Sequence, residues 1–482
     1  MTVLLSLLLL QGVAASSQDT TQGRPCLVAI DSVGRFSKST DASGEETRNG
    51  GGGVRAHCLG TGTTVSADSF AHYRGPGRLD LIGHVQIRDT AMALDAHFAS
   101  YFLKDERLEA HNNVVATNRR NGSVLRGPNL KYWRAVKGVR DTVEMYATQR
   151  PTVEYRQSPD SGGGGPQQEP YIIVGDRLRF KGDDRMWAGG KVTIDRSDFA
   201  SRSDSMMLDQ TTGFGVLVGK PSVEGRGSAT PGQPNKGYTL VGTRIELGLA
   251  QRDIRQVKAL SHGKVTGADW TLTADTIDLR IANRLLQQTF AWGDTTRPHA
   301  VSTLYTILSD SMAIDSPDEV LKESRAFGKA YATAKRDSTT PRDQVDWVHG
   351  DSITIRFTQE QDSATKSQHA RLQELIARGN ARALTHHPER NDSTKADSAK
   401  TDSTKADSAK AVVPNVAINY SRGHVITMTT LHDRIDRVVV SGNADGVHLE
   451  PRPAVEADSV KRARADSARA DSARAARRPA TP

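Results

Sequence analysis

The phrase LIGHVQI, at residues 81–87, joins a glycine and a polar residue to a short run of alternating apolar residues. Four related phrases follow along the chain: WAGGKVTI at 187–194, LSHGKVTG at 260–267, AFGKAYAT at 326–333 and IARGNARA at 376–383. An enzyme site is normally built once, whereas a stacked structural unit recurs at intervals. We therefore interpret the phrase as part of a repeated structural unit and not as an enzyme site.

The residues around these phrases alternate with a period of two, which is typical of half-buried β-strands. Helical arrays would instead place apolar residues at i, i+3, i+4 and i+7. The sequence thus predicts an all-β fold. The apolar residues that share one side of a predicted strand are Leu79, Leu81, Val85 and Ile87, then Leu178 and Phe180, Val192 and Ile194, Ile277, Leu279 and Ile281, and Ile353, Ile355 and Phe357. In the first of these strands the other side carries Asp80, His84, Gln86 and Arg88.

The alternation changes phase inside the predicted strands. Leu272 and Ala274 share one parity, and Ile277 takes the other, across Asp275. A second slip separates Leu240 from Ile245. Since a shift of one residue turns every side chain to the opposite face, each strand must bend or bulge there. We expect corners that fold each ribbon into two sheets, with the recurring glycine where strands turn or backbones crowd.

Composition and the first residues indicate an exported protein. The 482 residues suffice for two or three domains or one long repeat array, and 36% are apolar. The net charge of +8 suits contact with anionic surfaces or lipids, although a merely soluble basic protein would carry it too. The apolar run at 3–10, with Val13 and Ala15 at −3 and −1 of a cleavage site, predicts a signal peptide over 1–15. No basic residue precedes that run, so either the signal is weak or the true start lies further upstream. The GRPC stretch lacks a lipoprotein box, and no later stretch is apolar enough to cross a membrane, so we expect export without a lipid anchor or membrane span.

Two cysteines and two low-complexity segments complete the outline. Cys26 and Cys58 could form one disulfide across a mobile loop at NGGGG (49–53), or remain two buried thiols. The pentads from Asp392, and the ARADSARADSAR tail, contain almost nothing apolar and predict disorder, as a solvated linker and a basic tail.

The sequence contains no pattern typical of catalysis. GxSxG, GxxxxGK[ST] and HExxH are absent, and two cysteines cannot make a zinc site of the usual spacing. His386 and His387 adjoin in a loop-like stretch, where surface histidines are commoner than ligands. We expect no enzyme activity, no catalytic or metal-binding residue and no cofactor.

An ordered series of short motifs runs through residues 66–133. It consists of Ala67, Asp68, Tyr73, Gly83, Val85, Asp95, Tyr101, the NNVV of 112–115, Gly122, Leu125, Gly127 and Tyr132. This series resembles the OstA-like (LptA-type) β-jelly-roll family of lipopolysaccharide transport. The likeness is strongest over 66–155 and recurs more weakly through 171–450. Asn113 stands where the second Gly-x-Val phrase of the family has glycine.

The resemblance implies a tandem jelly roll made of stacked, open, V-shaped pairs of sheets. We expect an OstA-like domain at 26–155, continuing repeats at 171–385, a linker at 386–411, a last repeat at 412–452 and a disordered basic tail at 453–482. The fourteen apolar residues above would line an inner groove that binds acyl chains. Phe180, Phe290 and Phe357 would set its width, and Arg78, Arg88 and Lys191 would meet phosphates at its rim.

The implied function is non-enzymatic transfer of lipopolysaccharide or a similar glycolipid across the periplasm to the outer membrane. Expected partners are that lipid, other jelly-roll proteins of the transport chain paired edge to edge, and the membrane surface, but no nucleic acid. Two alternatives stay open. A structural or scaffold protein of the cell envelope would use the same fold with a filled interior. A carbohydrate-active β-helix enzyme would need shorter coils of about 20–25 residues and paired carboxylates across a cleft.

Overall fold

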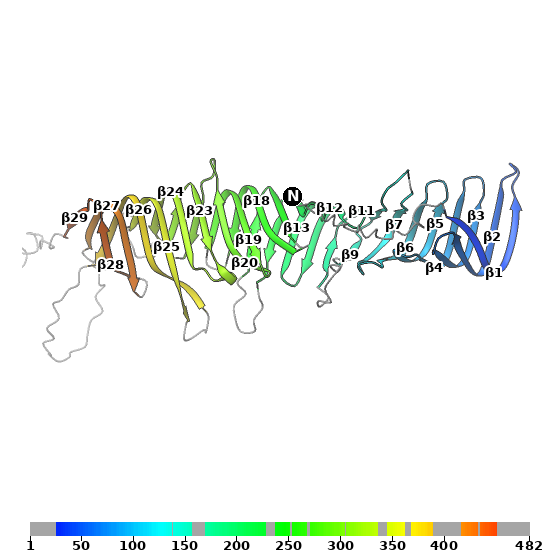
Figure 1. The fold of residues 1–482 in the computed structure, drawn as a ribbon, viewed down its shortest axis with the longest axis horizontal. Helices are drawn as coiled ribbons and strands as arrows, with labels where there is room; N and C mark the ends of the chain where they lie inside the picture. The colour runs from blue at the N-terminus through cyan, green and yellow to red at the C-terminus, as the bar shows by residue number, and fades with distance from the viewer. Residues whose placement is uncertain are drawn as a thin grey trace, which may run out of the picture. The chain divides into compact units, whose positions relative to one another are not determined.

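The computed structural model describes residues 26–136, 138–156, 169–227, 237–250, 253–267, 270–303, 305–335, 345–361, 368–388, 416–431 and 434–450. Within these ranges the chain forms β-strands and one 3-10 turn, η1 (Pro317–Glu319) (Figure 1). It divides into two compact units. Unit 1 lies within residues 1–298, 313–322 and 361–368, and unit 2 takes 299–312, 323–360 and 369–482. The predicted all-β fold is confirmed.

Unit 1 begins with long strands and continues with a mixture of long and short ones. Its strands are β1 (Leu27–Thr40), β2 (Glu46–Leu59), β3 (Thr64–Tyr73), β4 (Arg78–Arg88), β5 (Met92–Phe102), β6 (Arg107–Asn118), β7 (Val124–Trp133), β8 (Glu144–Thr148), β9 (Thr152–Tyr155), β10 (Tyr171–Val174), β11 (Arg177–Lys181), β12 (Arg185–Arg196), β13 (Phe199–Asp209), β14 (Phe214–Val218), β15 (Ser222–Gly225), β16 (Tyr238–Val241), β17 (Arg244–Ala250), β18 (Asp253–Thr266), β19 (Trp270–Ala282), β20 (Leu285–Trp292) and most of β23 (Ser311–Asp315).

Unit 2 is built in the same way. Its strands are β21 (His299–Ser302), β22 (Tyr305–Leu308), β24 (Glu323–Ala334), most of β25 (Trp347–Gln361), β26 (Gln368–Pro388), β27 (Val416–Leu431), β28 (Arg434–Ser441) and β29 (Asp445–Leu449).

The long strands of unit 1 are bent, and each half pairs with different neighbours. In β12, residues 185–189 pair with β11, whereas residues 193–195 pair with β10. Two successive short strands take the place of one long bent strand that is interrupted at its corner. The strands β8 and β11 pair with each other on one side of the corner, and β9 and β10 pair with each other on the other side. We call these sides half-sheet 1, which contains 64–66 of β3, 85–88 of β4, β9, β10, β15 and β16, and half-sheet 2, which contains 69–73 of β3, 78–82 of β4, β8, β11, β14 and β17.

Pairs of consecutive left-handed residues make the corners of alternate strands. The ladder skips two residues there, as at Gly83 and His84 between Ile82 and Val85. Positive φ is rare outside glycine, and asparagine tolerates it better than most residues. The Asn112–Asn113 corner has φ of 63° and 53°, so asparagine replaces glycine there without changing the geometry. The other corner pairs are Gly52–Gly53, Gln149–Arg150, Gly190–Lys191, Gly219–Lys220, Ser261–His262, Gly328–Lys329, Gly379–Asn380 and Gly442–Asn443.

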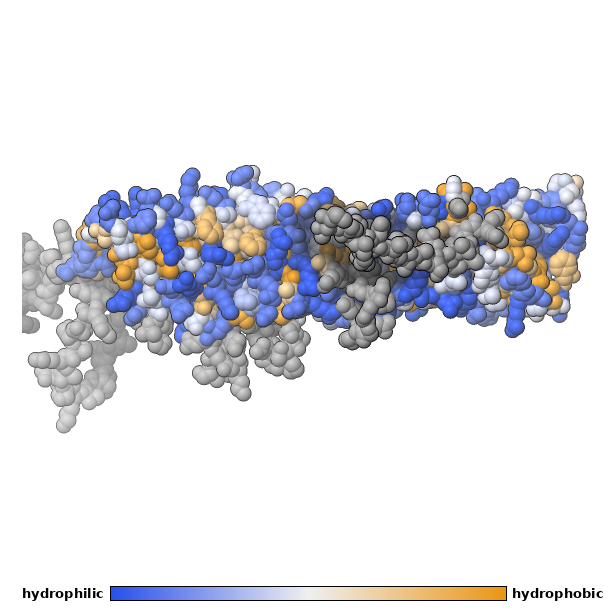
Figure 2. All heavy atoms as spheres, in the orientation of Figure 1, coloured by the Kyte–Doolittle hydropathy of each residue, from blue (hydrophilic) through white to orange (hydrophobic). Residues whose placement is uncertain are grey.

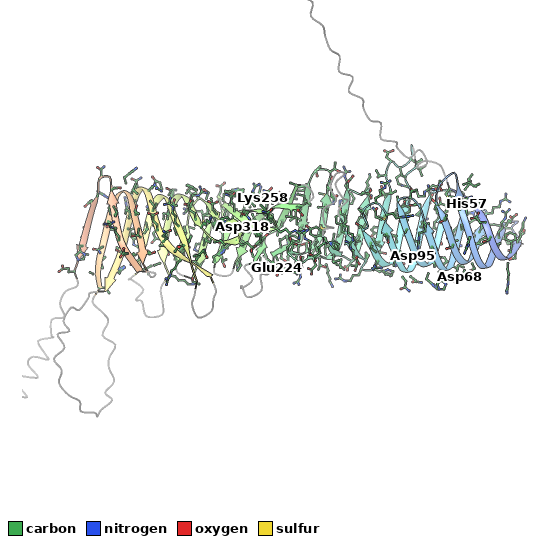
Figure 3. All side chains as sticks on the ribbon, turned by 60° about the horizontal axis from the view of Figure 1, so that its bottom comes forward. His57, Asp68, Asp95, Glu224, Lys258 and Asp318 are labelled. Carbon is green, nitrogen blue, oxygen red and sulfur yellow. A yellow bond between two sulfur atoms is a disulfide. The ribbon has the colours of Figure 1, made fainter. Side chains whose placement is uncertain are left out.

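An aspartate on the preceding strand packs against several of these glycines. A Cβ at Gly83 would lie 2.2 Å from Asp68 Oδ2, and one at Gly190 would lie 2.3 Å from Asp176 Oδ2. The same relation joins Gly328 to Asp310. The backbone adds a hydrogen bond, because Asp176 N donates to Gly190 O at 2.9 Å. These positions therefore require glycine both for its φ and for the absence of a side chain. Figure 3 labels Asp68, the aspartate that faces Gly83 in unit 1.

The bends occur where the sequence pattern changes phase. The β18–β19 ladder is interrupted opposite Asp275, between Ala274 and Thr276. The second predicted slip falls between β16, which ends at Val241, and β17, which begins at Arg244. Apolar side chains on the inner faces are buried on both sides of each corner, whereas the outer surface is largely hydrophilic (Figure 2). The predicted corner in each ribbon is thus confirmed.

Three local expectations differ from the structure. The NGGGG stretch is not a mobile loop, because it lies within β2 and its glycines form a corner. His386 and His387 lie in strand β26, which ends at Pro388, so the predicted linker begins too early. Asp80 is buried although its position predicted exposure, and it accepts a hydrogen bond from Ser100 Oγ at 2.7 Å.

The strand pairing continues from β9 to β10, with Tyr155 opposite Tyr171.

The predicted signal peptide at 1–15, residues 389–411 of the linker and the tail at 453–482 lie outside the described residues.

We expect Gly190→Ala to lower the free energy of unfolding by about 3–4 kcal/mol, because the added methyl meets the Asp176 carboxylate in a backbone that disfavours it. Gly44→Ala is the matched control: its φ is +79°, but nothing lies within 4 Å, so it should cost only about 1–2 kcal/mol. Urea unfolding measures both. Equal losses for the two variants would contradict a packing role for the corner aspartate.

Candidate functional site: the apolar interior

The interior of the bent ribbons contains most of the residues that the sequence singled out. Eleven of the fourteen are buried, and Phe180, Ile281 and Phe357 are half-buried. In unit 1 the predicted residues are Leu79, Leu81, Val85 and Ile87 on β4, Leu178 and Phe180 on β11, Val192 and Ile194 on β12, and Ile277, Leu279 and Ile281 on β19. Ile353, Ile355 and Phe357 lie on β25 in unit 2.

The two halves of a single strand place predicted residues in both half-sheets of unit 1. On β4, Leu79 and Leu81 belong to half-sheet 2, while Val85 and Ile87 belong to half-sheet 1. The predicted set of groove residues left out other side chains of the same interior, which are less than 2% exposed: Leu94, Leu130, Ile173, Leu217, Leu240, Ile245 and Leu272. Several of these residues lie in strands of only four or five residues, which are too short to show a clear alternation of apolar and polar residues.

The strand ends far from the corners form two edges, which we call lips. Lip 1 borders half-sheet 1 and includes Cys26, Asn118, Tyr155 and Asp198. Lip 2 borders half-sheet 2 and includes Glu106, Asp183, Gln210, Asp253 and Arg284. The described residues bring the two lips into contact at several places along unit 1.

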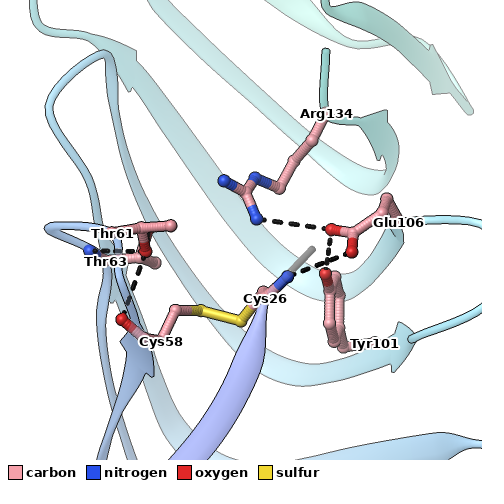
Figure 4. Close-up of a disulfide and its surroundings, with 7 residues drawn as sticks. All are labelled: Cys26, Cys58, Thr61, Thr63, Tyr101, Glu106 and Arg134. Atoms are coloured by element: carbon pink, nitrogen blue, oxygen red, sulfur yellow. Dashed lines mark hydrogen bonds and ion pairs between the residues drawn. A yellow bond between two sulfur atoms is a disulfide. The ribbon is translucent and has the colours of Figure 1, made fainter. Parts of the chain in front are cut away.

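The first contact lies beside the disulfide at the start of β1 (Figure 4). Cys26 and Cys58 are joined, with their Cα atoms 5.0 Å apart, on lip 1. The Cys26 amide donates a hydrogen bond to Glu106 Oε1 on lip 2 at 3.1 Å. The buried Glu106 carboxylate also accepts from the Tyr101 hydroxyl and from Arg134 Nη1. Burial, with this hydrogen bond, raises the pKa of Tyr101, so its hydroxyl remains a donor at neutral pH.

Polar side chains make the next contacts along the lips. Asn118 Nδ2 donates to Asp183 Oδ1 at 2.9 Å, and Arg120 Nη1 lies 3.4 Å from Asp183 Oδ2. Further along, the Gln210 side-chain amide donates to the Tyr155 hydroxyl. Both contacts run from one lip to the other.

A cluster of arginines and aspartates forms a further contact between the lips. Arg196, whose side chain is 3% exposed, forms a two-point ion pair with Asp198 at 2.5 and 2.8 Å on its own lip. Two longer ion pairs cross the lips: Arg196 Nη1 to Asp253 Oδ1 at 3.9 Å, and Arg284 Nε to Asp198 Oδ2 at 3.8 Å.

A small pocket of about 20 Å³ lies among these side chains, with Phe199, Tyr238 and Ile281 also in its wall. Three buried polar atoms in this region have no hydrogen-bond partner: Arg196 Nη1, Asp253 Oδ1 and the Tyr171 hydroxyl. Tyr171 lies under the Arg196 guanidinium at 4.1 Å, and burial raises its pKa to about 12. Such atoms are costly to leave unpaired, so this contact is weaker than its burial suggests. No sequence pattern predicts this cluster, because its charged members come from three separate segments.

The three basic residues predicted at the rim of the groove differ in their position and in their contacts. Arg78 pairs with Asp80 at 3.2 Å, and Arg88 pairs with Asp95 at 2.5 Å. Lys191 is exposed, but it lies at a corner and therefore on the edge away from the lips. Phe290, predicted to set the width of the groove, is half-buried on β20.

In the described part of the chain, no three histidine, cysteine, aspartate or glutamate side chains cluster as metal ligands would. Nor does any helix in that part have the length and apolar character needed to cross a membrane.

Comparison with solved structures gives a distant likeness. No family model matches the chain, and no curated protein sequence matches it. Among solved structures, the chain is similar to LptH from Pseudomonas aeruginosa, described as the LptA-homologous periplasmic component of the lipopolysaccharide transport device. The match covers 27% of this chain and 94% of LptH, at 15% identity and a TM-score of 0.23.

Replacing Cys26 and Cys58 together by serine should lower the free energy of unfolding by about 3–4 kcal/mol, because the bridge closes a chain segment of 32 residues. Urea unfolding of the variant, and of the native protein in reductant, measures the loss. Unchanged stability in both would show that the strand pairing alone fixes this end of unit 1.

Proposed function

We propose that the protein is a non-enzymatic periplasmic carrier that shields the acyl chains of lipopolysaccharide or a similar glycolipid on the way to the outer membrane. One observation carries the proposal: the bent strands of unit 1 contribute apolar side chains, one after another, to a common interior between two half-sheets. The resemblance of residues 66–133 to the OstA-like family supports the same function.

The energetic argument concerns the acyl chains. Each methylene removed from water is worth roughly 0.8 kcal/mol, so a glycolipid with several acyl chains cannot cross an aqueous space unshielded. An interior lined by Leu178, Ile277 and Leu279 offers an apolar surface in exchange. The sugar and phosphate groups would remain in water outside the lips.

Exposed apolar residues on terminal strands support a second part of the proposal, docking to other transport components. Among the described residues, β1 pairs only with β2, and it exposes Leu27, Ile30 and Phe36. In unit 2, β29 pairs only with β27 in the described part of the chain, and it exposes Val447 and Leu449. An unpaired edge with apolar side chains is suited to strand addition by a neighbouring sheet.

One observation favours the alternative, a scaffold of the cell envelope. Leu178 and Leu279 are fully buried, as they would be in an ordinary packed core. Carrying lipid thus requires the half-sheets to move apart, whereas a scaffold requires them to stay closed.

Photo-crosslinking separates the two functions. A photoreactive amino acid at Leu81, Ile87, Leu178 or Leu279 should capture lipopolysaccharide in cells, because these side chains point into the interior. The matched controls are Gln86 and Arg179, exposed neighbours on the outer faces of the same strands, which should capture none. Equal capture at inner and outer positions, or none at either, would favour the scaffold.

A further inference from the structure

The contacts between the lips bear on how an acyl chain would reach the interior of unit 1. The half-sheets are joined covalently at the corners, so that edge cannot open without breaking strands. In the described part of unit 1, the contacts across the opposite edge are made by side chains and one backbone amide. A chain that enters from the side must therefore pass between the lips.

We propose that the cluster of Arg196, Asp198, Asp253 and Arg284 is a side entrance for an acyl chain, held shut by an ionic latch. This inference rests on the proposed carrier function. The latch consists of the two ion pairs that cross the lips, Arg196 with Asp253 and Arg284 with Asp198.

The geometry makes this contact suited to opening. Both crossing pairs are long, at 3.9 and 3.8 Å, whereas the Arg196–Asp198 pair on lip 1 is short and has two contacts. Opening the lips leaves that short pair intact, so Arg196 is not stranded without a counter-charge. Three buried atoms have no hydrogen-bond partner while the lips are closed: Arg196 Nη1, Asp253 Oδ1 and the Tyr171 hydroxyl. These atoms can form hydrogen bonds with water when the lips part.

The surroundings of the latch fit an amphiphile that enters tail first. Phe199, Tyr238 and Ile281 line the pocket beside the charged groups, so apolar surface continues inward from the latch. Arg255 and Arg284 also border the pocket, and Arg284 is exposed, so an anionic headgroup would remain beside it in water. The ligand class is therefore an acyl chain attached to an anionic headgroup.

The test is to bind the lips together. In Asp198→Cys/Arg284→Cys, a short bismaleimide would link lip 1 to lip 2, while the native disulfide leaves no other reactive thiol in the chain. Uptake of purified lipopolysaccharide should fall about tenfold relative to the same variant capped with a monomaleimide, because the entrance can no longer open. Arg284→Gln, at a side chain 38% exposed, should instead load about threefold faster because one crossing pair is lost.

The matched control is Arg185→Cys/Asp209→Cys, whose native side chains pair at 3.1 Å on lip 2 alone. Linking this pair should leave uptake unchanged. If the cross-lip link also leaves uptake unchanged, while lipid still binds, the chain enters elsewhere and the latch is refuted. If neither the native protein nor any variant takes up lipid, the carrier function itself fails, and the side entrance with it.

Discussion

The fold depends on the left-handed backbone at the corners of alternate ribbons, where a glycine such as Gly83, Gly190 or Gly328 packs closely against an aspartate. A strand that changes half-sheet must reverse the direction of its side chains without losing the ladder on either side. Two consecutive residues with positive φ achieve this, and a facing carboxylate leaves no room for a Cβ at the first of them, as at Gly190 beside Asp176. Repetition of this corner keeps the apolar residues of successive strands on one inner face.

This constraint explains why so much of the fold could be predicted from the sequence. The recurring Gly-polar phrase is the corner itself, and the phase slip at Asp275 is the change of half-sheet. Eleven of the fourteen predicted interior residues are buried for the same reason. The prediction of a mobile loop at 49–53 was wrong because runs of glycine are also typical of loops. The pairing of this segment with β1 and β3 shows that it belongs to a strand.

The contacts between the lips could not be predicted, because they join residues that no local pattern relates. Asn118 contacts Asp183, and Arg196 contacts Asp253, because the bent ribbons bring the ends of the two half-sheets together. Their chemistry differs from that of the corners. At the corners the half-sheets are joined by continuous backbone, which is tightly packed. At the lips they are joined by polar groups, whose contacts with one another water can replace. Unit 1 thus has one permanent edge and one edge able to separate, which suits a carrier whose interior must admit a ligand.

The central claim is that the apolar interior holds acyl chains. Native mass spectrometry of the protein, purified from an envelope that makes lipopolysaccharide, tests it most directly. A population heavier than the chain by the mass of an amphiphile with several acyl chains, lost when an inner residue such as Leu178 is replaced by aspartate in a variant that still folds, is the predicted result. Detection of the bare chain alone, under conditions in which a known lipid carrier retains its ligand, would contradict it.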